Sequence, residues 1–141
     1  MPSRRRLARI AVMQTVFELQ VREIDPPVSL QKNMEALGGS EQVDCAFSEK
    51  LLAGVRGKWE QIREAIQSHA PEWPLTRMDT ITRSILMIGA YELLFGGDAP
   101  PAVVMNEAIE VAKEYGTEES AKFVNGVLNA LAHRGDAKKA E

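Results

Sequence analysis

The chain has 141 residues, of which 45% are hydrophobic and 26% charged, and its net charge is −3. These values suit one globular domain, which we expect over residues 1–135, with a frayed tail over residues 136–141. A single cysteine, Cys45, excludes an intramolecular disulfide and a cysteine-based metal site. No run of about 18 apolar residues predicts a membrane span, and no apolar segment follows the basic start as in a signal peptide. We therefore expect a cytoplasmic protein.

Apolar residues recur with helical spacing along almost the whole chain, and no segment shows the alternation of a strand. Proline and glycine residues separate the helical segments. The predicted helices cover residues 3–24, 27–37, 40–68, 79–95, 101–115 and 118–135. Gly54 and Gly57 weaken the third of these and mark where it can break, and residues 70–75 predict an ordered loop. The pattern predicts an all-α compact bundle of about six to seven helices.

The first predicted helix is apolar on two sides. One stripe contains Leu7, Ile10, Met13, Phe17 and Val21. A second stripe, on roughly the opposite side, contains Val12, Val16 and Leu19. A helix that is apolar on two sides packs against neighbours on both. We therefore expect a central helix, or one that adds a contact between subunits, which leaves a homodimer open.

Four arginines gather at the start of this helix, and no acidic residue precedes Glu18. They are Arg4, Arg5, Arg6 and Arg9. Cations at a helix N-terminus oppose the helix dipole, so the cluster works against local stability. Such conflicts often mark function, and the planar guanidinium suits phosphate. The cluster predicts contacts with a polyanion; the alternative interpretation is a merely charged helix start.

A second candidate group lies on the last predicted helix. Phe123 falls about 90° away from the apolar stripe, next to Lys122 and near Asn125. A partly exposed ring there can stack on an unpaired base, with the lysine and the amide as polar contacts. The alternative is that the ring packs against a neighbouring helix.

We find no motif of an enzyme. The chain has no nucleotide-binding glycine loop, no metal-spaced cluster of histidines and cysteines, and no nucleophile elbow. His69 and His133 both lie at positions typical of solvated side chains. We therefore expect no catalytic residues, no cofactor and no metal.

Several blocks of sequence, in order over about residues 4–131, together point to a known family. The first helix carries Arg5-Arg6-Leu7-Ala8-Arg9 and then Gln14. The middle of the chain carries Leu51-Leu52-Ala53-Gly54-Val55 and Ala90-Tyr91-Glu92-Leu93. The strongest block runs from Asn106 to Lys113 and on through Tyr115-Gly116 to Lys122-Phe123-Val124-Asn125-Gly126-Val127-Leu128.

In their order and spacing these blocks resemble the NusB family. The resemblance implies two packed helical sub-bundles that share the N-terminal helix. It implies a transcription antitermination factor that binds single-stranded boxA RNA in nascent ribosomal RNA. It further implies a heterodimer with the ribosomal protein NusE, and contacts with other Nus factors and RNA polymerase. The RNA face carried over by position comprises Arg5, Arg6, Arg9, Gln14, Glu119, Lys122 and Phe123. The positions carried over for the protein partner are Thr82 and Met87, where the chain departs from the residues often found in the family.

Two other classes of function remain open at this point. The same fold resembles the N-terminal domain of a ribosomal RNA cytosine methyltransferase, which needs a further domain to bind its methyl donor. The chain can also be a purely protein-binding helical module, in which case the arginines do not contact RNA.

Overall fold

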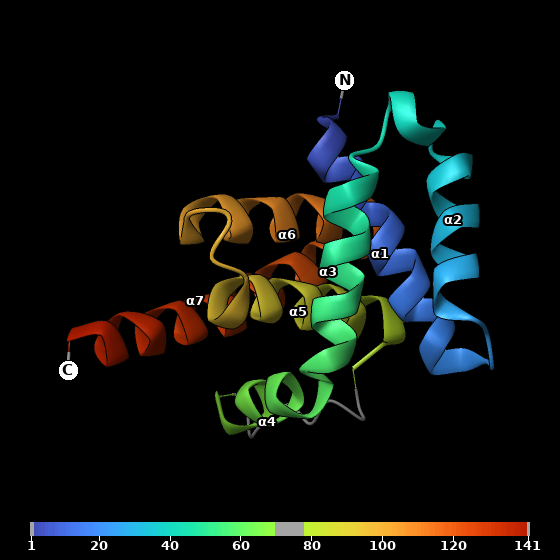
Figure 1. The fold of residues 1–141 in the computed structure, drawn as a ribbon. Helices are drawn as coiled ribbons and strands as arrows, with labels where there is room; N and C mark the ends of the chain where they lie inside the picture. The colour runs from blue at the N-terminus through green and yellow to red at the C-terminus, as the bar shows by residue number, and fades with distance from the viewer. Residues whose placement is uncertain (1, 70–77, 141) are drawn as a thin grey trace.

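The computed structural model describes residues 2–69 and 78–140, and for residues 134–140 the backbone alone (Figure 1). The described part of the chain is helical and contains no strand, which confirms the all-α class. In chain order its elements are α1 (Arg4–Val21), α2 (Pro26–Ala36), the 3-10 turn η1 (Gly39–Glu41), α3 (Cys45–Gly57), α4 (Trp59–His69), α5 (Thr80–Tyr91), the π-helical turn η3 (Glu92–Gly96), α6 (Pro101–Tyr115) and α7 (Glu118–Ala140).

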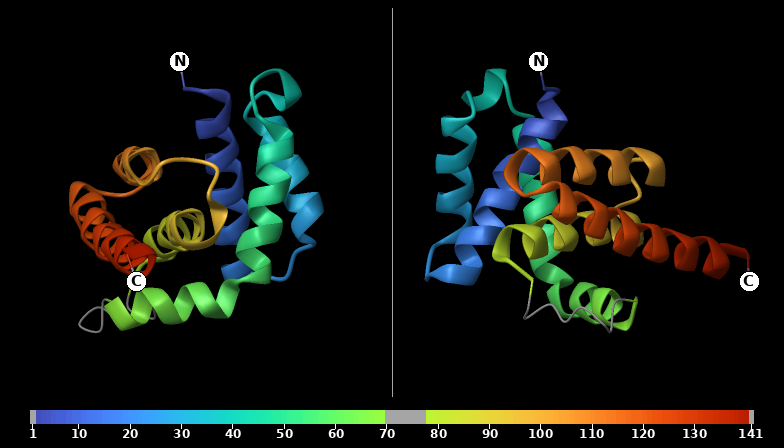
Figure 2. Two further views of the ribbon diagram at one scale, coloured as in Figure 1. Left: turned by 60° about the vertical axis from the view of Figure 1, so that its left-hand side comes forward. Right: turned by 180° about the vertical axis from the view of Figure 1, so that it is seen from behind.

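Helix α1 is shared by two sub-bundles, as the resemblance implied. It packs against α2 and α3 on one side and against α5 on the other, and α5 in turn packs against α4, α6 and α7 (Figures 1 and 2). The middle of each predicted stripe of α1 is covered, since Ile10, Val12, Met13 and Val16 are all buried, whereas Val21 at the end of the first stripe is exposed. The expectation of a central helix is therefore confirmed.

The boundary between α1 and α2 differs by a few residues from the prediction. The Ser3 hydroxyl caps α1 by accepting a hydrogen bond from the backbone N–H of Arg6 at 3.0 Å. The helix ends at Val21, three residues early, because Arg22 already has an extended backbone. Helix α2 begins with Pro26 in its first turn, and Asp25 before it is extended, as a residue before proline prefers.

The third predicted helix is divided in two. Helix α3 ends at Gly57, and Lys58 leaves the helical conformation before α4 begins. The predicted break is thus confirmed at Gly57, whereas Gly54 remains inside α3. The loop predicted over residues 70–75 lies outside the described residues.

The end of the chain corrects the expected tail. Helix α7 begins after Thr117, whose hydroxyl accepts a hydrogen bond from the N–H of Ser120 at 3.0 Å. It continues to Ala140, where we expected a frayed tail from Asp136. Alanine and lysine, which fill most of these last positions, are strong helix formers. No helix in the described part of the chain is long and apolar enough to cross a membrane.

Candidate nucleic-acid interface

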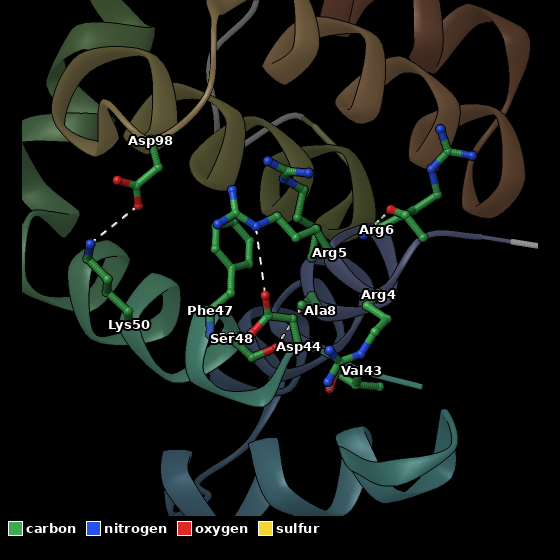
Figure 3. Close-up of polar contacts among 12 residues, drawn as sticks. Arg4, Arg5, Arg6, Ala8, Val43, Asp44, Phe47, Ser48, Lys50 and Asp98 are labelled. Carbon is green, nitrogen blue, oxygen red and sulfur yellow. Dashed lines mark hydrogen bonds and ion pairs between the residues drawn. The ribbon is translucent and has the colours of Figure 1, made fainter. Parts of the chain in front are cut away.

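The three arginines of the first turn of α1 point in different directions (Figure 3). Arg4 donates hydrogen bonds to the backbone carbonyls of Ser40 at 2.9 Å and Val43 at 3.2 Å, between α2 and α3. Arg6 extends toward α6, where its Nε and Nη2 donate to the carboxylate of Glu107 at 2.7 and 3.1 Å. Two members of the predicted cluster thus fasten α1 to its neighbours.

Arg5 is the arginine best placed for an anion from solution. Its guanidinium lies over the ring of Phe47, 4.6 Å from the ring centroid. Its Nε is 3.8 Å from the carboxylate of Asp44, and 49% of the side chain stays exposed. The ring and the carboxylate restrict the orientation of the guanidinium, so less side-chain entropy is lost when it binds a phosphate.

Arg9 does not lie where we predicted. It is 6% exposed, and its Nε and Nη2 donate to the carboxylate of Glu92, both at 2.9 Å. Its guanidinium lies 5.1 Å from the centroid of Phe47. A buried guanidinium whose fork is filled by a carboxylate cannot also bind a phosphate, so the prediction of a direct RNA contact by Arg9 is wrong.

Three residues that decide which arginines are paired and which stay exposed were not among the predicted site residues. Phe47 lies against both Arg5 and Arg9, and Glu92 and Glu107 neutralise Arg9 and Arg6. Glu92 carried a signal, because it is an acid inside an otherwise apolar helix. Phe47 carried none, because it belongs to the ordinary apolar stripe of its helix.

The pairing of Arg6 with Glu107 predicts a pH dependence of stability. The hydrogen bond from Arg6 lowers the pKa of Glu107, against a smaller opposing effect of burial. The pair therefore stabilises the fold fully above the pKa of an unfolded glutamate, about 4.3, and loses this contribution as the pH falls through the lowered folded pKa. We expect Glu107→Gln to be less stable than the wild type at pH 6, with the difference shrinking toward pH 3 in urea unfolding.

The control for this measurement is Glu60→Gln, which removes a 70% exposed carboxylate on α4. That variant should stay close to the wild type at every pH, because exposed ion pairs contribute little. A Glu107→Gln difference that is the same at pH 6 and pH 3 would contradict the role given to the pair.

The second group of predicted contacts lies on α7. Helix α6 lies between the first turn of α1 and the start of α7 (Figure 2). Glu119, Lys122 and Asn125 are exposed on α7, while Phe123 is partly buried against the core. The ring that lies against Arg5 and Arg9 is Phe47, and the expected cleft between Phe123 and the arginines stays a prediction.

The two residues expected to contact a protein partner are both interior. Thr82 is 3% exposed, and its hydroxyl donates to Asp79 at 2.8 Å and lies 3.3 Å from the hydroxyl of Ser120. Met87 is 1% exposed in the core. The prediction that they form a partner surface is wrong, because Thr82 belongs to the capped start of α5 and Met87 to its buried face.

A groove lies next to Thr82, with a volume of about 540 Å³. It is lined by Met13, Gln14, Phe17, Glu18, Val21, Arg22, Asn33, Ala36, Ile81 and Tyr115. Gln14, which we predicted to contact RNA, therefore lies in this groove. Val21 is 53% exposed and Tyr115 36%, which is unusual for large apolar side chains that share one depression. Such a surface suits an apolar segment of another protein.

The fold and its surfaces thus define an all-helical protein with a cationic, ring-supported patch at one end of its central helix and an apolar groove further along it. Comparison with known proteins identifies the family within this class. The model of the NusB family matches residues 6–133, so the chain belongs to the NusB family.

Individual relatives agree with this assignment. The transcription antitermination protein NusB of Bacillus licheniformis is 44% identical over 128 residues, which cover 91% of this chain and 95% of that protein. The solved structure of Thermotoga maritima NusB has a TM-score of 0.82 at 33% identity, covering 94% of this chain and 93% of that one. A structure of the antitermination factors NusB and NusE in complex with dsRNA has a TM-score of 0.80 at 24% identity, covering 92% and 96%, and shows likeness of fold alone.

Proposed function

We propose that this protein is a transcription antitermination factor that binds boxA-type single-stranded RNA in nascent ribosomal RNA. It does so together with a ribosomal protein of the NusE type, within the cytoplasmic complex of other Nus factors and RNA polymerase. The observation that carries the proposal is membership of the NusB family, with a 44% identical relative named as an antitermination protein. The function is one of binding and involves no catalytic step.

The RNA contact is centred on Arg5. Its guanidinium is half exposed and already oriented by Phe47, so it can pair with a phosphate and release the counterion bound there. Lys122, Asn125 and Glu119 are exposed on α7 and offer a cation, an amide and an acceptor for base edges. These α7 residues remain predicted contacts. Arg6 and Arg9 instead join α1 to α6 and η3 through their hydrogen bonds to Glu107 and Glu92.

The protein partner docks in the groove between α1, α2, α5 and α6. This proposal replaces the buried Thr82 and Met87 by residues that line the groove: the partly buried Ile81, which precedes Thr82 in the chain, the partly buried Phe17 and the exposed Val21. The whole chain has a net charge of −3, so its own attraction for RNA is weak. A basic partner adds positive charge to the complex and should raise its affinity for RNA.

The test is a titration of labelled boxA-type RNA at several salt concentrations, with the protein alone and with NusE. We expect tighter binding with NusE. Arg5→Gln should weaken binding in both cases and flatten the salt slope by about 1, as expected for the loss of one phosphate contact. Val21→Lys should remove the gain from NusE and leave the binding of the protein alone unchanged, because it places a charge in the groove.

Two variants serve as controls in the same titration. Arg63→Gln removes an exposed arginine of α4, and Val28→Lys adds a charge at a 64% exposed valine of α2 outside the groove. Both should behave as the wild type. Equal affinities with and without NusE, or an Arg5→Gln variant that keeps the wild-type salt slope, would refute the proposal and favour a purely protein-binding module.

A further inference from the structure

An aromatic pair lies at the surface beyond the arginine patch. Phe95, in the π-helical turn η3, is 42% exposed. Its ring centroid lies 6.1 Å from that of Tyr91, and the Lys58 ammonium lies 5.2 Å above its face. No carboxylate in the described part of the chain pairs with Lys58. The surface thus combines an accessible ring with an exposed cation.

Two features of the local backbone that are unfavourable for a regular α-helix hold the aromatic pair in place. Gly54 lies inside α3, and a methyl group there would overlap the hydroxyl and ring of Tyr91. Tyr91 can therefore lie against α3 only because this position is glycine, a poor helix former. Directly after Tyr91 the chain makes a π-helical turn, a rare conformation that is frequent at functional sites. Both features place Phe95 beside α3 instead of inside the core.

The aromatic pair continues the surface that begins at Arg5. Phe47 and Lys50 lie on α3, and Lys58 directly follows its last residue, Gly57. At the rise of an α-helix, Phe47 and Lys58 are about 16 Å apart. Phe47, which contacts Arg5, and Tyr91, which contacts Phe95, line the same small depression. Its other lining residues are Lys50, Leu51, Glu92, Gly96 and Asp98. Figure 3 shows Arg5, Phe47, Lys50 and Asp98 on this face, where Lys50 lies 3.3 Å from Asp98.

We propose that Phe95, flanked by Lys50 and Lys58, is a base-stacking platform that extends the RNA contact of Arg5 along α3. An unpaired base stacks on the face of Phe95 that Lys58 now covers, and the lysine moves on its flexible stem to an adjacent phosphate. Lys50 can exchange Asp98 for a phosphate, because their ion pair is largely exposed. An exposed ring between cations is the arrangement that binds single-stranded nucleic acid, and it explains why the ring is not buried.

This inference rests on the proposed function, and the same RNA titration in the presence of NusE tests it. Phe95→Leu should weaken binding roughly 5- to 150-fold without changing the salt slope, as for the loss of one stacked base. Phe95→Trp keeps a stacking face and should keep the affinity. Lys58→Gln should flatten the salt slope by about 1, whereas the control Lys113→Gln, at an exposed lysine of α6, should not.

A second measurement does not depend on a variant. RNA that carries 5-iodouridine should crosslink on irradiation to Phe95 or Tyr91, as located by mass spectrometry of the full-length wild-type protein with NusE. Crosslinks confined to other segments would overturn the inference.

The outcomes separate the two proposals. If Arg5→Gln weakens RNA binding and Phe95→Leu does not, the platform is overturned and the proposed function stands. If Phe95→Leu weakens the binding of NusE measured without RNA and leaves RNA affinity intact, the ring contacts protein and the inference is again overturned. If neither variant changes RNA binding, the proposed function fails together with the platform.

Discussion

Arg9→Met is expected to lower the free energy of unfolding by about 3–5 kcal/mol, because it leaves the carboxylate of Glu92 buried without its counterion. Both side chains are less than a tenth exposed, and two hydrogen bonds of 2.9 Å join them between α1 and η3. The loss of one partner therefore removes the attraction and retains the cost of burying the other charge. Urea unfolding at pH 7, followed by far-ultraviolet circular dichroism, measures the change.

The double variant Arg9→Met with Glu92→Leu is the matched control. Replacing a buried ion pair by apolar side chains of similar volume is often neutral or stabilising, so most of the lost stability should return. If Arg9→Met alone is as stable as the wild type, Glu92 does not need Arg9 as its counterion in the folded protein, and the prediction is contradicted. The double variant should also retain the salt slope of RNA binding, since Arg9 does not face solvent.

Gly54→Ala is expected to destabilise the protein by about 1–3 kcal/mol, although alanine is the better helix former by about 1 kcal/mol. The added methyl group would meet the Tyr91 hydroxyl and ring, so the ring or the backbone of α3 must move. The displacement should also reach Phe95, which lies next to Tyr91. Thermal and urea unfolding of the variant measure the loss.

Gly57→Ala provides the comparison on the same helix. No atom lies within 4 Å of a methyl group at Gly57, and its backbone does not require glycine. This substitution should therefore be neutral or stabilising. Combining Gly54→Ala with Tyr91→Leu, which removes the hydroxyl and the ring, should restore part of the lost stability. A Gly54→Ala variant more stable than the wild type would show that Tyr91 is not pressed against α3.

The helical class could be read from the sequence because apolar periodicity, proline and glycine act locally. The stripes of α1 identified a helix covered on both sides, and Pro26, Gly57 and Gly116 marked where helices begin or end. The cluster of arginines was equally visible, since it depends only on neighbours in the chain. The length of α7 was misjudged, because its last residues are charged yet favour helix.

The roles of individual side chains were decided by the tertiary structure. Arg5 and Arg9 look alike in the sequence, but one stays half exposed and the other is buried, because Glu92 is brought to Arg9 from 83 residues away. In the same way, packing buries Thr82 and Met87 and places the ring of Phe47 against Arg5 and Arg9. Local patterns determine which segments are helices, whereas contacts between distant segments determine which charges remain available to a ligand.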